Sequence, residues 1–117
     1  MKYEIRYRPS YSILDVSLEN GEQITGEAGA LIYMTPNIQV ETRMRERGLL
    51  GTLGLAIIGG QSFFVNDYKA RGGAAEVGLV AAPIGDIETL EVNPGKGYII
   101  QKASYLASTA GVDLDVK

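Results

Sequence analysis

The feature that most limits the fold of this chain is a two-residue alternation of apolar and polar side chains, interrupted by turn residues roughly every 8–12 positions. Successive side chains of a β-strand point to opposite faces, so the alternation predicts strands with one buried face. The 3.6-residue periodicity of an amphipathic helix is nearly absent. The sequence therefore predicts an all-β fold, most simply an antiparallel β-sandwich.

The most definite of the predicted strands is Ser62–Ala70, because it is rich in aromatic and β-branched residues. Glu19-Asn20-Gly21 and Thr35-Pro36-Asn37 are predicted turns, since asparagine and glycine tolerate positive φ and proline fixes φ. The predicted strands are Lys2–Tyr7, Ile13–Leu18, Gln23–Glu27, Ala30–Tyr33, Ile38–Thr42, Ser62–Ala70, Ala74–Ala81, Ile87–Val92, Tyr98–Gln101, Tyr105–Ala107 and Val112–Val116.

The sequence also contains a weak internal repeat of its strand and turn positions. Leu14-Asp15-Val16 and Ile38-Gln39-Val40-Glu41 match Leu90-Glu91-Val92 and Val112-Asp113-Leu114-Asp115 at an offset of about 74 to 76 residues. We interpret residues 1–117 as one all-β domain holding about one and a half units, the first over roughly 1–86 and a partial second over roughly 87–117. Half a unit cannot close its own sheet, so we expect an unpaired edge. Either a second copy covers this edge, or the chain is a fragment of a longer protein.

The least ordinary segment is residues 48–60, which carry no charge and follow a cluster of arginines. One interpretation is a short helical or irregular apolar crossover over an open end of the sandwich, because its aliphatic residues have helical spacing. The other is an exposed apolar patch that meets another subunit or a membrane surface, a pattern typical of interfacial binding. The candidate interaction surface consists of Arg43, Arg45, Arg47, Leu49, Leu50, Leu53 and Ile57.

The chain lacks the residues that several common catalytic and metal-binding sites require. The chain has no cysteine and no histidine, which removes the thiolate nucleophile, the commonest general base and the usual structural zinc ligands. Its glycines do not form a phosphate-binding loop. The carboxylate pairs Asp113 with Asp115 and Asp86 with Glu88 alternate with apolar residues, so we expect them on a solvated outer face. We therefore predict no catalytic, metal or cofactor residues and a non-enzymatic protein.

A family resemblance covers nearly the whole chain. Gly60-Gln61-Ser62-Phe63-Phe64-Val65-Asn66, together with Glu76-Val77-Gly78-Leu79, Gly85-Asp86-Ile87 and the segment from Tyr105 to Val112, resembles the mitochondrial-biogenesis family of altered-inheritance-of-mitochondria proteins. The resemblance implies repeats similar to those of the tryptophan RNA-binding attenuation protein, in a sandwich or short double-stranded β-helix. It also implies chains about twice this length that form trimeric rings. No catalytic residue carries over from the family.

Two functions and one further class follow as hypotheses. The first is a homo-oligomeric scaffold or interaction module, a trimer or higher by the resemblance, with a peripheral membrane contact through the apolar segment. The second is an RNA-binding ring, which the net charge of -3 disfavours and which would need Arg43, Arg45, Arg47, Lys69 and Arg71 to form one basic stripe. An enzyme or sensor would need a tyrosine-lined pocket with a perturbed carboxylate. The N-terminus lacks the apolar core of a signal peptide, so we expect a cytoplasmic location.

Overall fold

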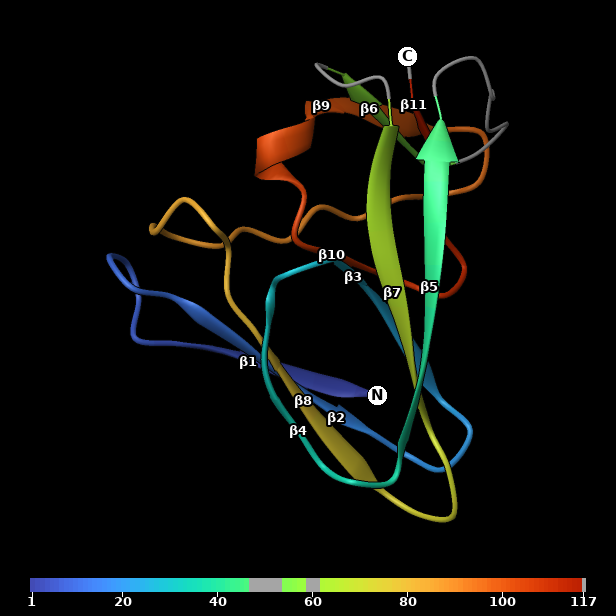
Figure 1. Cartoon of the computed structure of the whole chain (residues 1–117). Coiled ribbons are helices and arrows are strands. Elements are labelled where there is room, and N and C mark those ends of the chain that lie inside the picture. The colour runs from blue at the N-terminus through green and yellow to red at the C-terminus, as the bar shows by residue number, and fades with distance from the viewer. Residues whose placement is uncertain (47–53, 59–61, 117) are drawn as a thin grey trace.

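The computed structural model describes residues 1–46, 54–58 and 62–116. Within these ranges the chain is nearly all β, with three sheets and one turn of 3-10 helix, η1 (Lys102–Ser104) (Figure 1). Antiparallel sheet A has the order β1 (Lys2–Arg6), β2 (Ile13–Leu18), β8 (Ala75–Leu79), β4 (Leu31–Met34). Antiparallel sheet B has the order β10 (Ala107–Thr109), β3 (Gln23–Glu27), β7 (Ser62–Ala70), β5 (Ile38–Glu46). Parallel sheet C has the order β11 (Asp113–Val116), β6 (Gly54–Ile58), β9 (Gly97–Gln101).

Sheets A and B form a sandwich around the main hydrophobic core. Alternate residues of β2 and β8 point into it, and the register sets them side by side, with Leu14 opposite Leu79 and Val16 opposite Val77. Sheet B contributes Ile24 from β3 and Tyr68 from β7. Each fully buried aliphatic side chain of this kind contributes about 1.5–3 kcal/mol, so this layer is the main source of stability.

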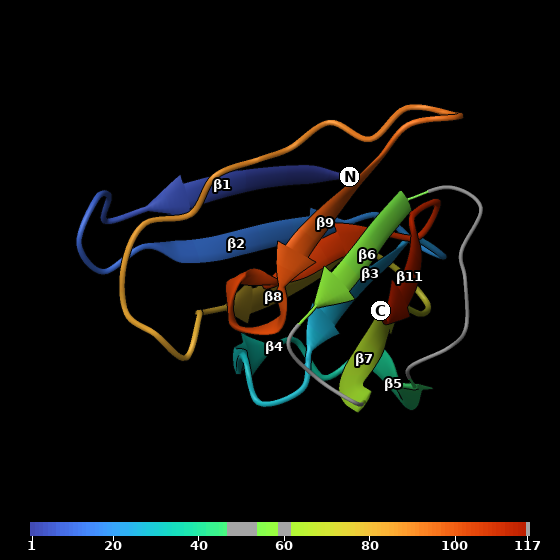
Figure 2. The ribbon, with the colours of Figure 1, turned by 90° about the horizontal axis from the view of Figure 1, so that it is seen from above.

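A second, smaller core lies between sheet B and sheet C. It contains Val65 of β7, Tyr105 after η1 and Leu114 of β11, with Tyr98 and Ile100 of β9 partly buried against them. Val65 and Tyr68 have opposite parity along β7, so they point to opposite faces of sheet B. Sheet B is therefore the middle layer, with sheet A on one face and sheet C on part of the other (Figure 2).

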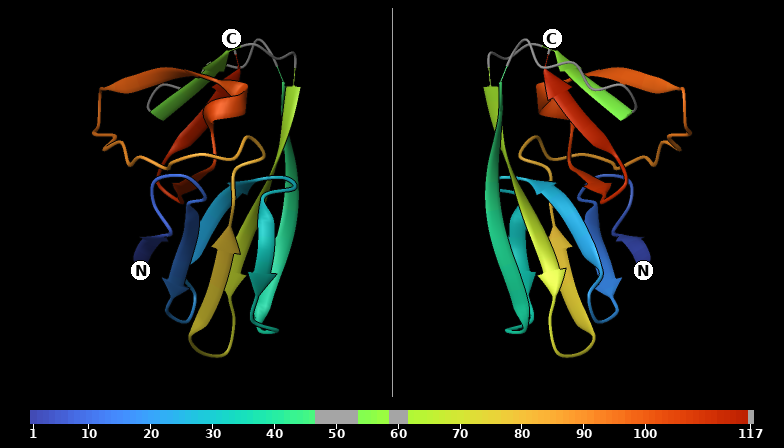
Figure 3. Two further views of the ribbon diagram at one scale, coloured as in Figure 1. Left: turned by 90° about the vertical axis from the view of Figure 1, so that its left-hand side faces the viewer. Right: turned by 90° about the vertical axis from the view of Figure 1, so that its right-hand side faces the viewer.

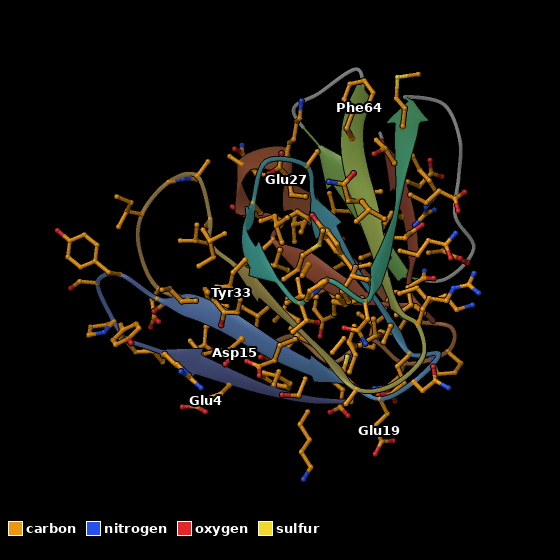
Figure 4. All side chains as sticks on the ribbon, turned by 60° about the horizontal axis from the view of Figure 1, so that its bottom comes forward. Glu4, Asp15, Glu19, Glu27, Tyr33 and Phe64 are labelled. Atoms are coloured by element: carbon orange, nitrogen blue, oxygen red, sulfur yellow. The ribbon has the colours of Figure 1, made fainter. Side chains whose placement is uncertain are left out.

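The outer face of sheet A carries a close contact between a tyrosine and a glycine. Tyr33 of β4 and Asp15 of β2, both labelled in Figure 4, lie opposite Gly78 of β8. The Tyr33 ring covers the space that a side chain at Gly78 would fill. Asp15 is buried beneath this ring and pairs with Arg6 at 2.9 Å. Burial, and then the Asp15 carboxylate, raise the pKa of the Tyr33 hydroxyl above its ordinary value.

Most of the strand predictions are confirmed. Ile13–Leu18, Gln23–Glu27 and Ser62–Ala70 have the expected bounds, and the sandwich of two antiparallel sheets is present. Near the C-terminus the expected strand Tyr105–Ala107 is displaced, because Lys102–Ser104 forms η1 and β10 begins only at Ala107.

Two expectations were wrong. Residues 54–58, expected within a helical or irregular crossover, form strand β6, which pairs on both sides with β9 and β11. The expected strand Ile87–Val92 does not form, and residues 80–96, here called the strap, run as irregular chain past β1. The strap is held beside β1 by single bonds, such as the hydrogen bond from the Tyr3 hydroxyl to Thr89 at 3.2 Å and the bond from the Ser12 backbone N–H to the Gly85 carbonyl at 3.0 Å.

The same result bears on the internal repeat. Leu14-Asp15-Val16 lies in a central strand of sheet A, whereas Leu90-Glu91-Val92 lies in the strap. The two copies therefore differ in secondary structure, and attenuation-protein-like repeats remain a prediction from sequence.

We predict that replacing Gly78 by alanine lowers the free energy of unfolding by about 1–3 kcal/mol, because a Cβ there would overlap the Tyr33 ring. Urea unfolding measures the effect. Gly111→Ala is the matched control, since the space around Gly111 is open. In the Tyr33→Ala background the cost of Gly78→Ala should shrink, and strict additivity of the two changes would contradict the proposed overlap.

Candidate interaction surface

The most prominent unpartnered feature in the described part of the chain is the outer edge of β5. This nine-residue strand pairs with β7 on one side and ends sheet B on the other (Figure 3). An edge strand presents a row of backbone N–H and C=O groups that another strand can pair with. Natural proteins usually shorten or protect such edges, so a long one is a candidate site for an interaction.

The face that β5 shares with the sandwich core becomes exposed along the strand. Ile38 packs against the main core, but Val40 is 42% exposed and Met44 is 46% exposed. Phe64, which lies opposite Met44 on β7, is 52% exposed. The end of β5 that carries Met44 and the start of β7 that carries Phe64 belong to the part of the two strands that extends beyond sheet A in Figure 1, so these two side chains are uncovered.

A buried polar cluster fixes β5 on its other face. Asp67 of β7 accepts a 2.6 Å hydrogen bond from Thr25 Oγ1 and a bidentate pair from Arg43, with Nε at 2.6 Å and Nη2 at 2.9 Å. The hydrogen bond that Arg43 donates to Asp67 is also the main reason why the pKa of Arg43 is raised. Because three strands meet in this cluster, it locks the edge strand to the middle of sheet B.

A second set of hydrogen-bonded polar side chains holds β5 on the opposite face of the sheet. Thr42 Oγ1 donates to Asn66 Oδ1 at 2.7 Å, and Asn66 Nδ2 donates to the Tyr68 hydroxyl at 3.2 Å. Edge strand and neighbour are thus joined by side chains on both faces as well as by the backbone ladder. The exposed edge is therefore rigidly placed for docking.

Of the seven residues of the predicted surface, Arg43 is the one whose side chain the structure describes, and it is paired with Asp67. Arg45 belongs to β5 and Ile57 to β6, as far as the backbone is concerned. The predictions for Arg47, Leu49, Leu50 and Leu53 fall outside the described residues. Sequence reasoning missed Asp67, although its position two residues after Val65 places both on the face that sheet C covers.

The carboxylates predicted to be solvated divide into two groups. Asp113 is exposed, but Asp115 is 3% exposed, so that half of the expectation was wrong. Leu114, which lies between them, points into the core between sheets B and C, so Asp113 and Asp115 share the opposite face of β11, where Asp115 is nevertheless buried. Asp86 and Glu88 are exposed as expected.

Asp86 anchors the strap through Arg8. Arg8 donates to both oxygens of Asp86, at 2.9 and 3.0 Å, and to Glu88 at 2.8 Å, while Ser12 also donates to Asp86 at 2.8 Å. The bonds from Arg8 come first among the causes that lower the pKa of Asp86 to about 2. A carboxylate held ionised in this way is a poor proton donor at neutral pH.

Between the strap and the main core lies an open groove of about 680 Å³. Its walls include Leu14, Val16, Ile87, Val92, Leu106 and Val112. Tyr3 and Tyr105 also line it, but the carboxylate with the strongly shifted pKa there is the ion-paired Asp86. The described residues include no cluster of acidic side chains suited to a metal ion.

Comparison with known proteins places this chain in a family. The family model described as "Mitochondrial biogenesis AIM24" matches residues 3–117, which is almost the entire sequence. The chain belongs to this family. The match confirms the resemblance seen in the sequence, while the family description itself gives no reaction and no ligand.

One curated relative illustrates how the family extends. An uncharacterised protein of Streptococcus pyogenes serotype M6 is 24% identical over 112 residues, an alignment that covers 92% of this chain and 44% of the relative. The chain thus spans less than half the length of this family member. No solved structure matches the chain. Within the residues that the structure describes, no helix has the length and apolar character needed to cross a membrane.

We predict that Asp67→Asn lowers the free energy of unfolding by about 1–3 kcal/mol, because it removes the charge that holds Arg43 and Thr25 together. Chemical denaturation measures the change. Asp113→Asn, an exposed position on β11, serves as the control and should have little effect. Equal stabilities of the two variants would show that the cluster does not anchor β5.

We also predict a loss of stability at alkaline pH that depends on Tyr105. Burial raises the pKa of Tyr105 to about 12, compared with an ordinary value near 10. The folded state therefore binds this proton more tightly, so the stabilisation is complete below pH 10 and declines as pH rises toward 12. Urea midpoints measured across this range should fall for the natural chain and fall less for Tyr105→Phe, with Tyr33 supplying the remaining slope. Identical slopes would contradict the assignment.

Proposed function

We propose that this member of the family is a non-catalytic interaction module that assembles with copies of itself in the cytoplasm. The single observation that supports the proposal is the outer edge of β5, which is nine residues long, pairs with no other strand among the described residues, and is flanked by the exposed side chains of Val40 and Met44. When a second strand pairs with such an edge, it forms backbone hydrogen bonds and at the same time buries the apolar side chains beside the edge.

The size of the chain favours the same conclusion. A chain of 117 residues buries a modest fraction of its surface, so contacts between copies would add to a limited core. The rigid polar clusters on both faces of β5 reduce the entropy that docking would cost.

RNA binding receives less support from the described residues. On the face that carries Arg43, that arginine is neutralised by Asp67, and Glu41 lies directly opposite Asp67. Lys69 on the same face is therefore separated from Arg43 by two acidic residues rather than joined to it in a basic stripe. Membrane contact through residues 48–60 stays a prediction from sequence.

We predict that the purified chain has a native mass that is a multiple of its 12.6 kDa protomer mass. Light scattering after size exclusion, over a range of micromolar concentrations, measures this mass. Val40→Lys, which adds a charge beside the free edge, should weaken assembly by at least about tenfold, or ~1.4 kcal/mol.

Tyr11→Lys is the matched control for that substitution. Tyr11 is 68% exposed and belongs to the β1–β2 connection of sheet A, whereas β5 is an edge strand of sheet B. Its replacement should leave the native mass unchanged. A stable monomer for the natural chain at every concentration would overturn the proposed function.

A further inference from the structure

The charge pattern of β5 is complementary to itself. From residue 40 to residue 44 the strand reads Val40, Glu41, Thr42, Arg43 and Met44, so an apolar pair and a pair of opposite charges are placed symmetrically about Thr42. We propose that two copies of this chain join through antiparallel pairing of their β5 strands, with the two-fold axis at Thr42. This inference rests on the proposed function, since it specifies the contact through which copies assemble.

A two-fold axis at Thr42 sets each residue of one strand against a defined residue of the other. Thr42 faces Thr42 of the second copy, Glu41 faces Arg43, and Val40 faces Met44, each of the last two pairs occurring twice. Directly opposed residues of antiparallel strands lie on the same face, so these are true neighbours. Opposite charges and apolar side chains in such positions both stabilise an antiparallel pair of strands.

Neighbouring registers lack this match. An axis at Glu41 would set two glutamates against each other, and an axis at Arg43 would set two arginines against each other. An axis at Val40 would set Glu41 against the neutral Gln39 and would leave Met44 without its apolar partner. Among these registers, the one centred on Thr42 uses both the charges and the exposed apolar side chains.

The side chains needed for this contact are available. Glu41 is exposed, and no ion pair to it is present within the described part of the chain. Arg43 uses two of the five N–H donors of its guanidinium for Asp67, so donors remain for a carboxylate on a second strand. Val40 and Met44 are the exposed apolar residues of β5, and their contact with a second copy would remove them from water.

The joined strands would extend sheet B into one continuous sheet across two copies. Since sheet B of one copy has four strands, the combined sheet would have eight. Both β5 edges would then be paired, which leaves that side of the assembly without a template for further strand addition. The contact is isologous and closes on itself.

Cysteine cross-linking tests this register directly, because the natural chain contains no cysteine. Three single variants are needed, Thr42→Cys, Val40→Cys and Met44→Cys, each at an exposed position. Circular dichroism and native mass confirm that each variant folds and assembles. Mild oxidation followed by non-reducing electrophoresis then measures how fast each forms a disulfide-linked dimer.

We expect Thr42→Cys to cross-link by itself, about a hundredfold faster than Val40→Cys, because a facing thiol has an effective concentration in the millimolar range. In the same register, two Val40 residues lie four positions apart along the strand, about 13 Å, which is beyond the reach of a disulfide. A mixture of Val40→Cys with Met44→Cys should nevertheless form the mixed dimer.

The outcomes separate this inference from the proposed function. If Val40→Cys cross-links rapidly with a second copy of itself, the strands pair in a different register, and the Thr42-centred contact is overturned. Assembly with no rapid cross-linking by any β5 variant would also overturn it, while the proposed function would stand on another surface. A monomeric chain would overturn both.

Discussion

The structure depends on one strand, β7, being buried on both faces. Tyr68 and Val65 point in opposite directions from it, and both are completely buried, one against sheet A and the other against sheet C. A strand in this position sends side chains into a core on both of its faces, so a polar group buried on either face must find partners inside. Asp67 meets this requirement by binding Thr25 and Arg43.

The internal pairing of Asp67 determines the character of the exposed edge. The arginine that satisfies Asp67 comes from β5, the outermost strand of the sheet, so the need of a buried carboxylate fixes an exposed strand in place. The same arginine has further N–H donors that these bonds to Asp67 do not use. The contacts between Asp67 and Arg43 therefore both stabilise sheet B and hold the edge of β5 in place for binding.

How much of this could be predicted from the sequence differs from element to element. Strands such as Gln23–Glu27 and Ser62–Ala70 were predictable because alternation and β propensity agree there. Alternation at Ile87–Val92 was misleading, since a strand also needs a ladder of backbone hydrogen bonds, whereas Tyr3 and Arg8 attach this part of the strap through side chains. The burial of Asp67 could not be predicted, because the pattern assumes that each sheet has one solvated face, whereas sheet C covers part of the second face of sheet B.

The contact between Tyr33 and Gly78 also restricts how this sequence can evolve. The two residues are 45 positions apart in the chain, yet they share a single volume on the surface of sheet A. A lineage can enlarge the residue at position 78 only after the ring at position 33 has been reduced, while the reverse order passes through an overcrowded intermediate. Across relatives the two positions should consequently change together, with the aromatic residue lost first.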